Sequence, residues 1–260
     1  SYSVSSYPSG TFSWADFFSQ DIKASKKFFE ELLGWTSEDM PTGEGRPDYT
    51  MFYLDGNEVA GGSPTFEASM PSFWSNYITV EDLDATIEKA KKLGAEVTMP
   101  AMDVLEAGRM ATLLDPTGAN INLWQPKNHI GAHVVNKTGA MCWNELYTPD
   151  LEKAKEFYGK LFGWTFETDD TGYTTIQNGK RMNGGIMEMT DDMDSFPPNW
   201  TVYFTVTDMK EALEKVEKLG GQIHMPMKEV GVGKIAMIAD PAGASLMLIE
   251  MSVEPEEWEN

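Results

Sequence analysis

The sequence predicts an α+β fold made of four tandem βαβββ units, arranged as two lobes that share one plan. The first observation behind this prediction is an internal duplication, because WNELYTPD at 143–150 is a near-copy of WADFFSQD at 14–21. The second is a repeat late in each half, where IADPAGASLMLIE at 238–250 answers LLDPTGANINLWQ at 113–125. The third is that each half contains, twice, a strand followed by a helix that starts at an aspartate.

Each half opens with a strand that runs into an amphipathic helix. The duplicated segments alternate as strands do and end in Asp21 and Asp150, residues that cap helices well. Helical spacing follows in KASKKFFEELLGW at 23–35 and KAKEFYGKLFGW at 153–164, and both segments end at Gly-Trp. We therefore predict a strand, a helix and then short strands in the first unit of each half.

The second unit of each half repeats this order. SNYITV at 75–80 has the pattern of its opening strand. Amphipathic helices follow in VEDLDATIEKAKKLGAEV at 80–97 and VTDMKEALEKVEKLGGQI at 206–223, each with an acidic first turn and a Lys-Leu-Gly end. The tract PKNHIGAHVVNKTG at 126–139 has no partner in the repeat, which indicates a linker. We predict three parts: a first lobe at 1–127, a linker at 128–138 and a second lobe at 139–260.

Composition limits the classes of partner. A chain of 260 residues with 41% hydrophobic and 12% aromatic residues can form two cores. Its net charge of -21 would repel nucleic acid and anionic membrane surfaces. No apolar run approaches the ~20 residues that span a bilayer. We expect a small molecule or another protein as partner, no nucleic acid and no membrane.

Three further expectations follow from local features. One cysteine, Cys142, excludes an intramolecular disulfide and a cluster of thiolate metal ligands. The opening SYSVSSYPSG has no basic region followed by an apolar segment, so nothing resembles a secretory signal and we expect a cytoplasmic protein. We also expect the acidic tail at 254–260 to be frayed and the opening SYSVSSYPSG to form an arm or to be disordered.

The motifs of the two halves together point to a known family. A helix beginning at an aspartate contains FF or FY, then LLGW or LFGW, and DP-x-G precedes a closing strand. This combination resembles the vicinal oxygen chelate superfamily, which includes glyoxalase I, extradiol dioxygenases and the bleomycin and fosfomycin resistance proteins. It is most similar to two-domain glyoxalase-like proteins of actinobacteria. The resemblance covers about 12–125 and 141–250, and it implies a curved sheet around a cup in each lobe.

The resemblance also implies where a metal would bind. The first ligand position, seven residues before each helix-capping aspartate, is held here by Trp14, Ser75, Trp143 and Thr201. The second position, seven residues after the aspartate of DP-x-G, is held by Asn122 and Met247 instead of glutamate. A third position lies in a hairpin, where Glu58 or Asn183 approximates it. The histidines lie in the linker (His129, His133) or in an outer strand (His224). We therefore predict cups that lack the ancestral metal, and no other cofactor.

Strand alternation predicts which side chains face each cup. In the first lobe these are Trp14, Asp16, Phe18, Ser75, Tyr77, Thr79, Asn120, Asn122 and Trp124. In the second lobe they are Trp143, Glu145, Tyr147, Thr201, Tyr203, Thr205, Ser245, Met247 and Ile249. The interleaved residues are apolar and suit packing under the helices. Large apolar walls with a few polar groups are typical of a site for a small organic ligand.

Two residue pairs are the strongest candidates for function. Trp14 and Trp143 would stack on a planar or cationic ligand, and Asp16 and Glu145 would hold a cationic group or act as catalytic bases. The alternative is structural: the tryptophans fill the cups as core residues, and the carboxylates bond to neighbouring backbone or tyrosine hydroxyl groups.

Three functions remain open at this point. We prefer a metal-free binding protein that captures a small organic molecule in one or both cups. The second is a glyoxalase-type lyase or isomerase, in which Glu145 or Asp16 removes a proton next to a carbonyl group. The third is a dioxygenase-like enzyme, which needs iron held by two histidines and a carboxylate that the sequence does not supply. The lobes are expected to pack pseudo-symmetrically in a monomer or a homodimer.

Overall fold

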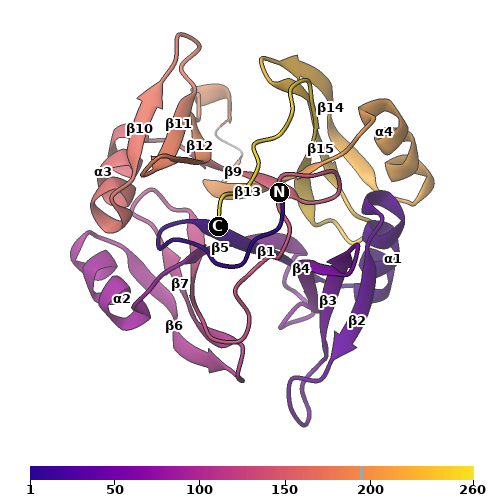
Figure 1. Cartoon of the computed structure of the whole chain (residues 1–260), viewed down its shortest axis with the longest axis horizontal. Coiled ribbons are helices and arrows are strands. Elements are labelled where there is room, and N and C mark those ends of the chain that lie inside the picture. Colours follow the sequence, from indigo (N-terminus) through magenta and orange to yellow (C-terminus); the bar gives the residue numbers. More distant parts are fainter. Residues whose placement is uncertain (194–195) are drawn as a thin grey trace.

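The computed structural model describes residues 1–193 and 196–260 and contains two eight-stranded sheets, one from each half of the chain (Figure 1). The elements of the first half are β1 (Phe12–Ser19), α1 (Ile22–Leu33), β2 (Thr36–Met40), β3 (Tyr49–Leu54), β4 (Asn57–Pro64), β5 (Phe73–Thr79), α2 (Leu83–Lys92), β6 (Glu96–Val104), β7 (Gly108–Leu114) and β8 (Asn120–Pro126).

The second half repeats the same order of elements. They are β9 (Met141–Thr148), α3 (Leu151–Phe162), β10 (Thr165–Thr168), β11 (Thr174–Asn178), β12 (Arg181–Glu188), a 3-10 turn η1 (Asp191–Met193), β13 (Asn199–Thr205), α4 (Met209–Lys218), β14 (Gln222–Val230), β15 (Gly233–Ala239) and β16 (Ser245–Met251). The predicted α+β fold of four βαβββ units is therefore confirmed.

Each sheet joins two units edge to edge. The strand orders are β2-β3-β4-β1-β5-β8-β7-β6 and β10-β11-β12-β9-β13-β16-β15-β14. The two opening strands pair antiparallel at the centre, β1 with β5 and β9 with β13, whereas β4 and β8 lie parallel to β1 and β5. This pairing places the opening strands of both units, which carry the candidate residues, side by side.

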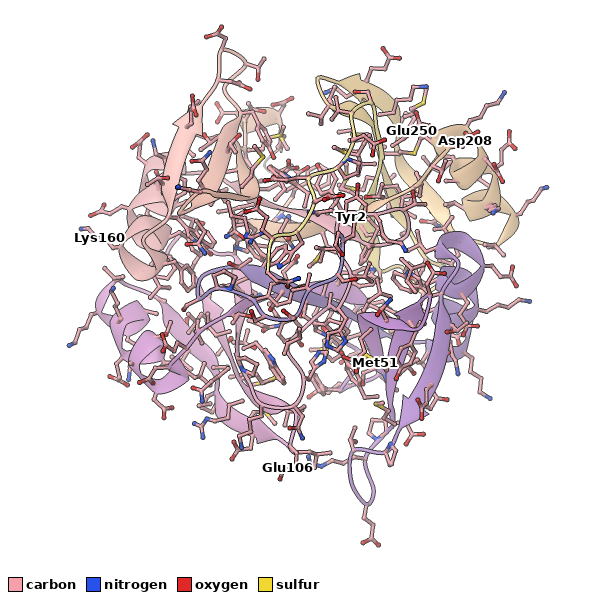
Figure 2. The ribbon with its side chains drawn as sticks, viewed as in Figure 1. Tyr2, Met51, Glu106, Lys160, Asp208 and Glu250 are labelled. Atoms are coloured by element: carbon pink, nitrogen blue, oxygen red, sulfur yellow. The ribbon has the colours of Figure 1, made fainter. Side chains whose placement is uncertain are left out.

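The helices begin and end where the sequence predicts. The side chains of Asp21, Asp82, Asp150 and Asp208 each accept a hydrogen bond from a backbone N–H in the first turn of the helix that follows. Gly34 and Gly163 end α1 and α3 in the left-handed conformation, with φ of 74° and 76°. At the start of α4, Glu250 lies beside Asp208 (Figure 2). Oε1 of Glu250 accepts a hydrogen bond from the backbone N–H of Met209.

The two halves pack through the faces that carry the helices. One buried cluster joins the first unit to the fourth, and the other joins the second unit to the third. Accordingly α1 contacts α4, and α2 contacts α3 (Figure 1). In the first cluster Phe204 of β13 lies with its ring 5.3 Å from that of Trp35 and 5.2 Å from that of Trp74. Because this interface uses one face of each sheet, the opposite faces, which form the cups, are directed away from it.

A tyrosine in one of these two interfaces has no equivalent hydroxyl in the other. The Tyr158 hydroxyl donates to Oδ2 of Asp115, in the DP-x-G loop of the other half, at 2.6 Å, and accepts from Nε1 of Trp200 at 3.0 Å. The matching position in α1 is Phe29. The matching polar atoms, Nε1 of Trp74 and Oδ2 of Asp240, are buried without a hydrogen-bond partner among the described residues.

Of the two alternatives for residues 1–10 the structure shows the arm, whereas the expectation of a frayed tail at 254–260 is wrong. The arm at 1–10 runs beside the linker, where Ser3 pairs with Val134, and both termini lie close together at the centre of the molecule (Figure 1). Trp258 in the tail is only 7% exposed, because Arg181 covers its ring at 3.5 Å and Tyr7 packs against it at 5.0 Å. Hydrogen bonds hold the tail as well, from the N–H of Trp258 to the carbonyl of Ser1 at 2.7 Å and from Nδ2 of Asn260 to the carbonyl of Ser3 at 3.1 Å. None of the helices at 1–193 and 196–260 combines the length and apolar character needed to cross a bilayer.

Candidate functional site

The inner face of the first sheet, called cup 1, holds a buried carboxylate. Cup 1 brings together the predicted residues Trp14, Asp16, Ser75, Tyr77, Asn122 and Trp124. Asp16 is 3% exposed, and its Oδ2 accepts hydrogen bonds from the hydroxyls of Tyr49 and Tyr77, both at 2.9 Å. Its Oδ1 accepts a third from Ser75 at 3.3 Å. Asp16 is thus held on both oxygens.

The inner face of the second sheet, called cup 2, repeats this arrangement. Cup 2 brings together the predicted residues Trp143, Glu145, Thr201, Tyr203 and Met247. Glu145 is 4% exposed, and its two oxygens accept from Tyr173 at 2.5 Å and Tyr203 at 2.7 Å. Trp143 donates to the Tyr173 hydroxyl at 2.8 Å, as Trp14 donates to Tyr49 at 3.0 Å. Both cups therefore share one frame of carboxylate, two tyrosines and one tryptophan.

One tyrosine of each frame was not predicted from the sequence. Tyr49 and Tyr173 come from the hairpin strands, and their rings lie over Gly61 and Gly185. A Cβ atom at either glycine would lie 1.9 Å from the tyrosine hydroxyl oxygen, so no other residue leaves room for the ring. A signal was present, because in both halves a tyrosine stands twelve residues before one glycine of a Gly-Gly pair.

Burial determines the protonation of these groups. It raises the pKa of Asp16 to about 7, although hydrogen bonds from Tyr77, Tyr49 and Ser75 lower it in part. Burial raises the pKa of the hydroxyls of Tyr49 and Tyr77 well above the usual value, and the nearby Asp16 raises it further. In cup 2, burial and the nearby Glu145 do the same for Tyr173 and Tyr203. All four tyrosines therefore remain hydrogen-bond donors at physiological pH.

The two cups differ on the strands beside this frame. In cup 1, Thr112 donates to Asn122 at 2.6 Å and Asn122 donates to Ser75 at 2.6 Å, which continues the chain of hydrogen bonds to Asp16. At the equivalent places in cup 2, in strand register, lie Met237 and Met247. Thr201, which takes the place of Ser75, donates to Asn199 at 2.6 Å. Cup 2 has thioether side chains where cup 1 has a polar chain.

The linker covers cup 1. His129 lies with its ring 4.5 Å from that of Trp14 and 5.7 Å from that of Trp124. Its Nδ1 is 2.9 Å from Oε2 of Glu58, and its carbonyl oxygen accepts from Nε1 of Trp124 at 2.9 Å. Trp14 and Trp124 are consequently only 4% and 5% exposed. The structural alternative, in which tryptophan fills its cup, therefore describes cup 1. Sequence reasoning left His129 in the linker and did not place it against these rings.

Cup 2 has no such cover among the described residues that pack against it. Trp143, Tyr147 and Cys142 are partly exposed, as are the thioethers of Met225, Met237 and Met251 around the buried Met247. Strand register places Ile249 where cup 1 has Trp124, and Met182 where it has Glu58. The aromatic wall of cup 2 is therefore accessible at its rim.

The side chains of the cups do not fit the divalent ion that the resemblance implies. Each frame supplies one carboxylate whose oxygens already accept hydroxyl hydrogens, together with indole, hydroxyl and either amide or thioether groups. Divalent zinc, nickel or iron takes several imidazole or carboxylate ligands that converge on one point. Within 1–193 and 196–260 no group of three His, Cys, Asp or Glu side chains is placed to share an ion.

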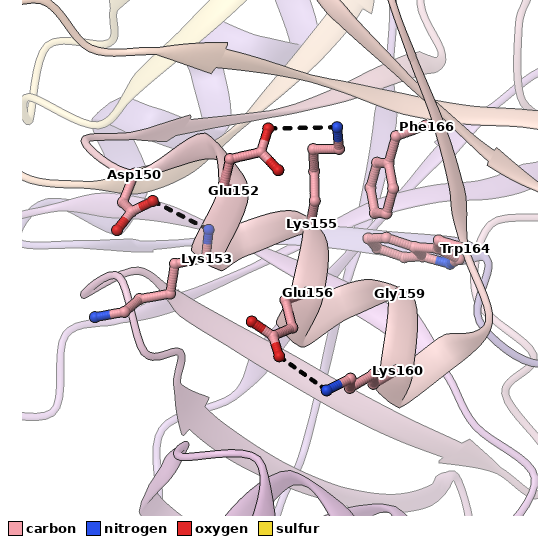
Figure 3. Close-up of a pocket in the computed structure, with 9 residues that line it drawn as sticks. All are labelled: Asp150, Glu152, Lys153, Lys155, Glu156, Gly159, Lys160, Trp164 and Phe166. Carbon is pink, nitrogen blue, oxygen red and sulfur yellow. Dashed lines mark hydrogen bonds and ion pairs between the residues drawn. The ribbon is translucent and has the colours of Figure 1, made fainter.

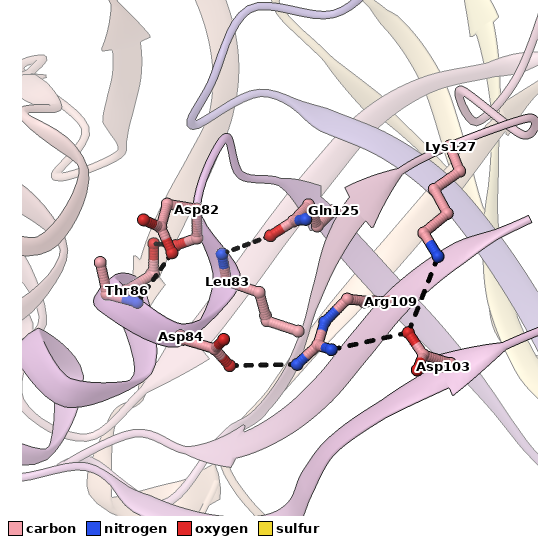
Figure 4. A network of polar contacts seen from close by, with 9 residues as sticks. Asp82, Leu83, Asp84, Thr86, Asp103, Arg109, Gln125 and Lys127 are labelled. Atoms are coloured by element: carbon pink, nitrogen blue, oxygen red, sulfur yellow. Dashed lines mark hydrogen bonds and ion pairs between the residues drawn. The ribbon is translucent and has the colours of Figure 1, made fainter.

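Two surface hollows lie outside the cups and contain none of the predicted site residues. One runs along α3 beside Trp164 and Phe166, where Lys155 pairs with Glu152 at 3.6 Å and Lys160 with Glu156 at 2.8 Å (Figure 3). In the other, Arg109 pairs with Asp84 at 3.1 Å and Asp103 at 3.6 Å (Figure 4). Acidic and basic side chains balance in the first hollow, whereas the second is mainly acidic around Arg109. Since neither contains a predicted site residue, the cups remain the candidate site.

Comparison with known proteins places this geometry in a family. The model of the Glyoxalase/Bleomycin resistance protein/Dioxygenase superfamily matches residues 11–123 and again 132–248. CFP32 of Mycobacterium tuberculosis, a protein provisionally named a glyoxylase, is 37% identical over 95% of this chain and 97% of its own length. The anthracycline biosynthesis protein DnrV of Streptomyces peucetius is 30% identical over 93% of this chain and 94% of its own length.

Solved structures agree on the fold. The 2,3-dioxygenase LapB from Pseudomonas sp. KL28 matches with a TM-score of 0.65 at 14% identity, over 96% of both chains. The Mn(II)-bound glyoxalase from Novosphingobium aromaticivorans matches with a TM-score of 0.64 at 12% identity, over 97% of this chain and 85% of that one. The chain therefore belongs to the Glyoxalase/Bleomycin resistance protein/Dioxygenase superfamily, with two repeats of its domain in tandem.

Proposed function

We propose that the protein binds a small organic molecule in cup 2. The observation that carries this proposal is the different exposure of two equivalent tryptophans, since Trp14 is 4% exposed beneath His129 whereas Trp143 is partly exposed. An accessible indole beside a buried carboxylate combines an apolar wall with a fixed polar group, and small-molecule sites are built in this way.

Each side chain of cup 2 has a role in this proposal. Trp143 and Tyr147 form the aromatic wall, and Met247 with its neighbouring thioethers forms an adaptable wall opposite. Glu145 accepts hydrogen bonds from the ligand. A carboxylate offers about four acceptor positions. Tyr173 and Tyr203 each occupy one position on Glu145 and the Tyr147 hydroxyl also lies beside it, so at least one position remains for a ligand.

The relatives support an organic ligand of aromatic character. Two of them, from Streptomyces peucetius and Streptomyces sp. strain C5, carry names from anthracycline biosynthesis, and each is 30% identical to this chain. These names belong to the relatives, and we transfer from them only the class of ligand. The aromatic wall of cup 2 is consistent with that class.

A glyoxalase-type lyase or isomerase is the second candidate, favoured by the name of CFP32 and by the buried Glu145. Glu145 would remove a proton next to a carbonyl group, and the hydroxyls of Tyr173 and Tyr203 would stabilise the enolate oxygen. Both hydroxyls already donate to Glu145, so each would have to turn from the base to the substrate. This competition ranks the enzyme second. Neither cup supplies the two histidines and the carboxylate that would hold the iron of a dioxygenase.

A thermal-shift screen with aromatic and carbonyl compounds tests the proposal. A ligand of cup 2 is expected to raise the Tm by roughly 5 °C at a hundredfold excess over its Kd and to be recovered unchanged. Trp143→Ala should abolish the shift, whereas Phe66→Ala, which removes an aromatic ring 64% exposed in the other half, should leave it intact. A shift that survives Trp143→Ala would refute binding in cup 2, and conversion of the compound would favour the lyase or isomerase.

A further inference from the structure

The chain itself supplies a ring that occupies cup 1. The imidazole of His129 contacts Trp14 and Trp124 edge to face, with interplanar angles of 84° and 71°. Oε2 of the Glu58 carboxylate lies 2.9 Å from Nδ1 of this imidazole. Cup 1 thus shows what the shared frame accommodates over its tryptophan: a flat nitrogen heterocycle whose N–H or positive charge meets an acidic group.

Cup 2 has the same tryptophan without that ring. The residues that replace Trp124 and Glu58 are Ile249 and Met182, neither of which supplies a ring or an acid over Trp143. The acceptor that remains is Glu145. Asp16 receives hydrogen bonds from three hydroxyl groups in cup 1. Glu145 receives them from Tyr173 and Tyr203, and the Tyr147 hydroxyl also lies beside it, while Thr201 donates to Asn199. Cup 2 therefore combines a partly exposed indole with a carboxylate that keeps at least one acceptor position.

The charged side chain of cup 2 is acidic. The residues described above for cup 2 include a carboxylate and no lysine, arginine or histidine, and the chain carries a net charge of -21. A cation gains both from the face of an indole and from a carboxylate, whereas an anion would meet repulsion. We infer, on the basis of the proposed binding in cup 2, that its ligand is a planar nitrogen heteroaromatic that is cationic or bears N–H donors.

Three flat probes of equal ring number test this inference on the unmodified protein. They are 9-aminoacridine, which is a cation at neutral pH, 9-methylanthracene, which is uncharged, and anthracene-9-carboxylate. Binding is measured by equilibrium dialysis at about 0.15 M and about 0.5 M salt, because the higher ionic strength suppresses attraction to the acidic surface. The inference predicts one site per chain that persists at high salt, with 9-aminoacridine bound at least about tenfold more tightly than either other probe.

Two matched variants locate the site. Glu145→Gln should lower the affinity for 9-aminoacridine about tenfold or more, while Asp16→Asn, the same change in cup 1, should leave it within about twofold. Equal binding of all three probes would contradict the inference that the ligand is a heteroaromatic cation, and it would not contradict binding in cup 2. Binding of none would also overturn the heteroaromatic cation, while the thermal-shift screen decides separately whether cup 2 binds a ligand. The comparison of probes needs no variant, so it decides the matter even if Glu145→Gln fails to fold.

Discussion

The two cups share a frame and differ in what covers it. In both, a buried carboxylate is held by two tyrosine hydroxyls, and a tryptophan donates to one of them. In cup 1 a histidine from the linker lies over the tryptophan, and in cup 2 the equivalent tryptophan is partly exposed. Duplication has thus preserved the interior hydrogen bonds, while the residues around them separate a filled cup from an accessible one.

The strands beside the frame follow the same division. Cup 1 continues its hydrogen bonds through Asn122 and Thr112, and a fully satisfied network of this kind fixes a single arrangement of side chains. Cup 2 has Met247 and Met237 in register with them, and thioether side chains adapt to the shape of a ligand. We regard cup 1 as a structural element and cup 2 as the binding element of the same protein.

The largest expected effect comes from breaking the shared frame itself. Gly61→Ala and Gly185→Ala each place a methyl group 1.9 Å from a tyrosine hydroxyl oxygen, so the ring must leave its carboxylate. We expect each variant to lose roughly 4 kcal/mol of the free energy of unfolding in urea melts, from overpacking and from a buried carboxylate that loses a donor. Gly231→Ala has nothing within 4 Å of the new methyl group and should be neutral. Tolerance of Ala at both positions would show that the tyrosines are not fixed as described.

The next effect is a pH dependence that belongs to cup 1. Asp16 has a pKa of about 7 in the folded state, raised from 3.8 by burial, so the folded protein holds a proton that the unfolded chain releases above about pH 4. The contribution of Asp16 to the free energy of unfolding is therefore constant below about pH 4. It falls progressively between about pH 4 and 7 and is constant again above about pH 7. Asp16→Asn should remove that slope, which we place at roughly 2–4 kcal/mol between pH 4 and 7. Parallel curves for wild type and variant across this range would contradict it.

Emptying cup 1 should bring it closer to cup 2. His129→Gly removes the ring between two tryptophans and should cost roughly 2–3 kcal/mol of stability in urea melts. Added imidazole should restore part of the Tm, because it fits the vacated space and meets Glu58. His133→Gly is the matched control: its side chain is 40% exposed and lies 3.8 Å from the same Glu58 oxygen. Its removal vacates no space between two tryptophans, so imidazole should stabilise it less than it stabilises His129→Gly. The linker would not be the occupant of cup 1 if imidazole acted equally on both variants.

The smallest effect extends the comparison to the two interfaces between the halves. Phe29→Tyr would place a hydroxyl between Nε1 of Trp74 and Oδ2 of Asp240, as Tyr158 does between Trp200 and Asp115. We expect a gain of about 1 kcal/mol in urea melts, because two buried polar atoms acquire a partner. Tyr158→Phe, the reverse change, should lose about 2 kcal/mol. A loss of stability in both variants would mean that the first interface has no space for the oxygen.

Much of this architecture is encoded in local patterns. Strand alternation placed Trp14, Asp16 and Tyr77 on one face, and the repeat placed their counterparts in the second half. Aspartate caps and glycine ends fixed the helices. These features depend on neighbours within one or two elements, which a single sequence displays.

The remaining parts of the site depend on contacts between segments that no periodicity links. Tyr49 reaches Asp16 from a hairpin strand only because Gly61 leaves space, and that coupling appears only once the strands are paired. His129 lies in a tract outside the repeat, so neither spacing nor symmetry predicts its contact with Trp14. The tail has a composition typical of disorder, yet it is held by the buried Trp258 and by hydrogen bonds to the N-terminal arm.

The most direct test of the account is fluorine NMR of the protein with its eight tryptophans replaced by 5-fluorotryptophan, titrated with 9-aminoacridine. Single Trp→Phe variants assign the resonances of Trp143 and Trp14. The account predicts that the resonance of Trp143 moves with the probe while that of Trp14, enclosed beneath His129, stays in place. Movement of Trp14 with Trp143 unchanged would contradict the division of the two cups into a filled one and an accessible one.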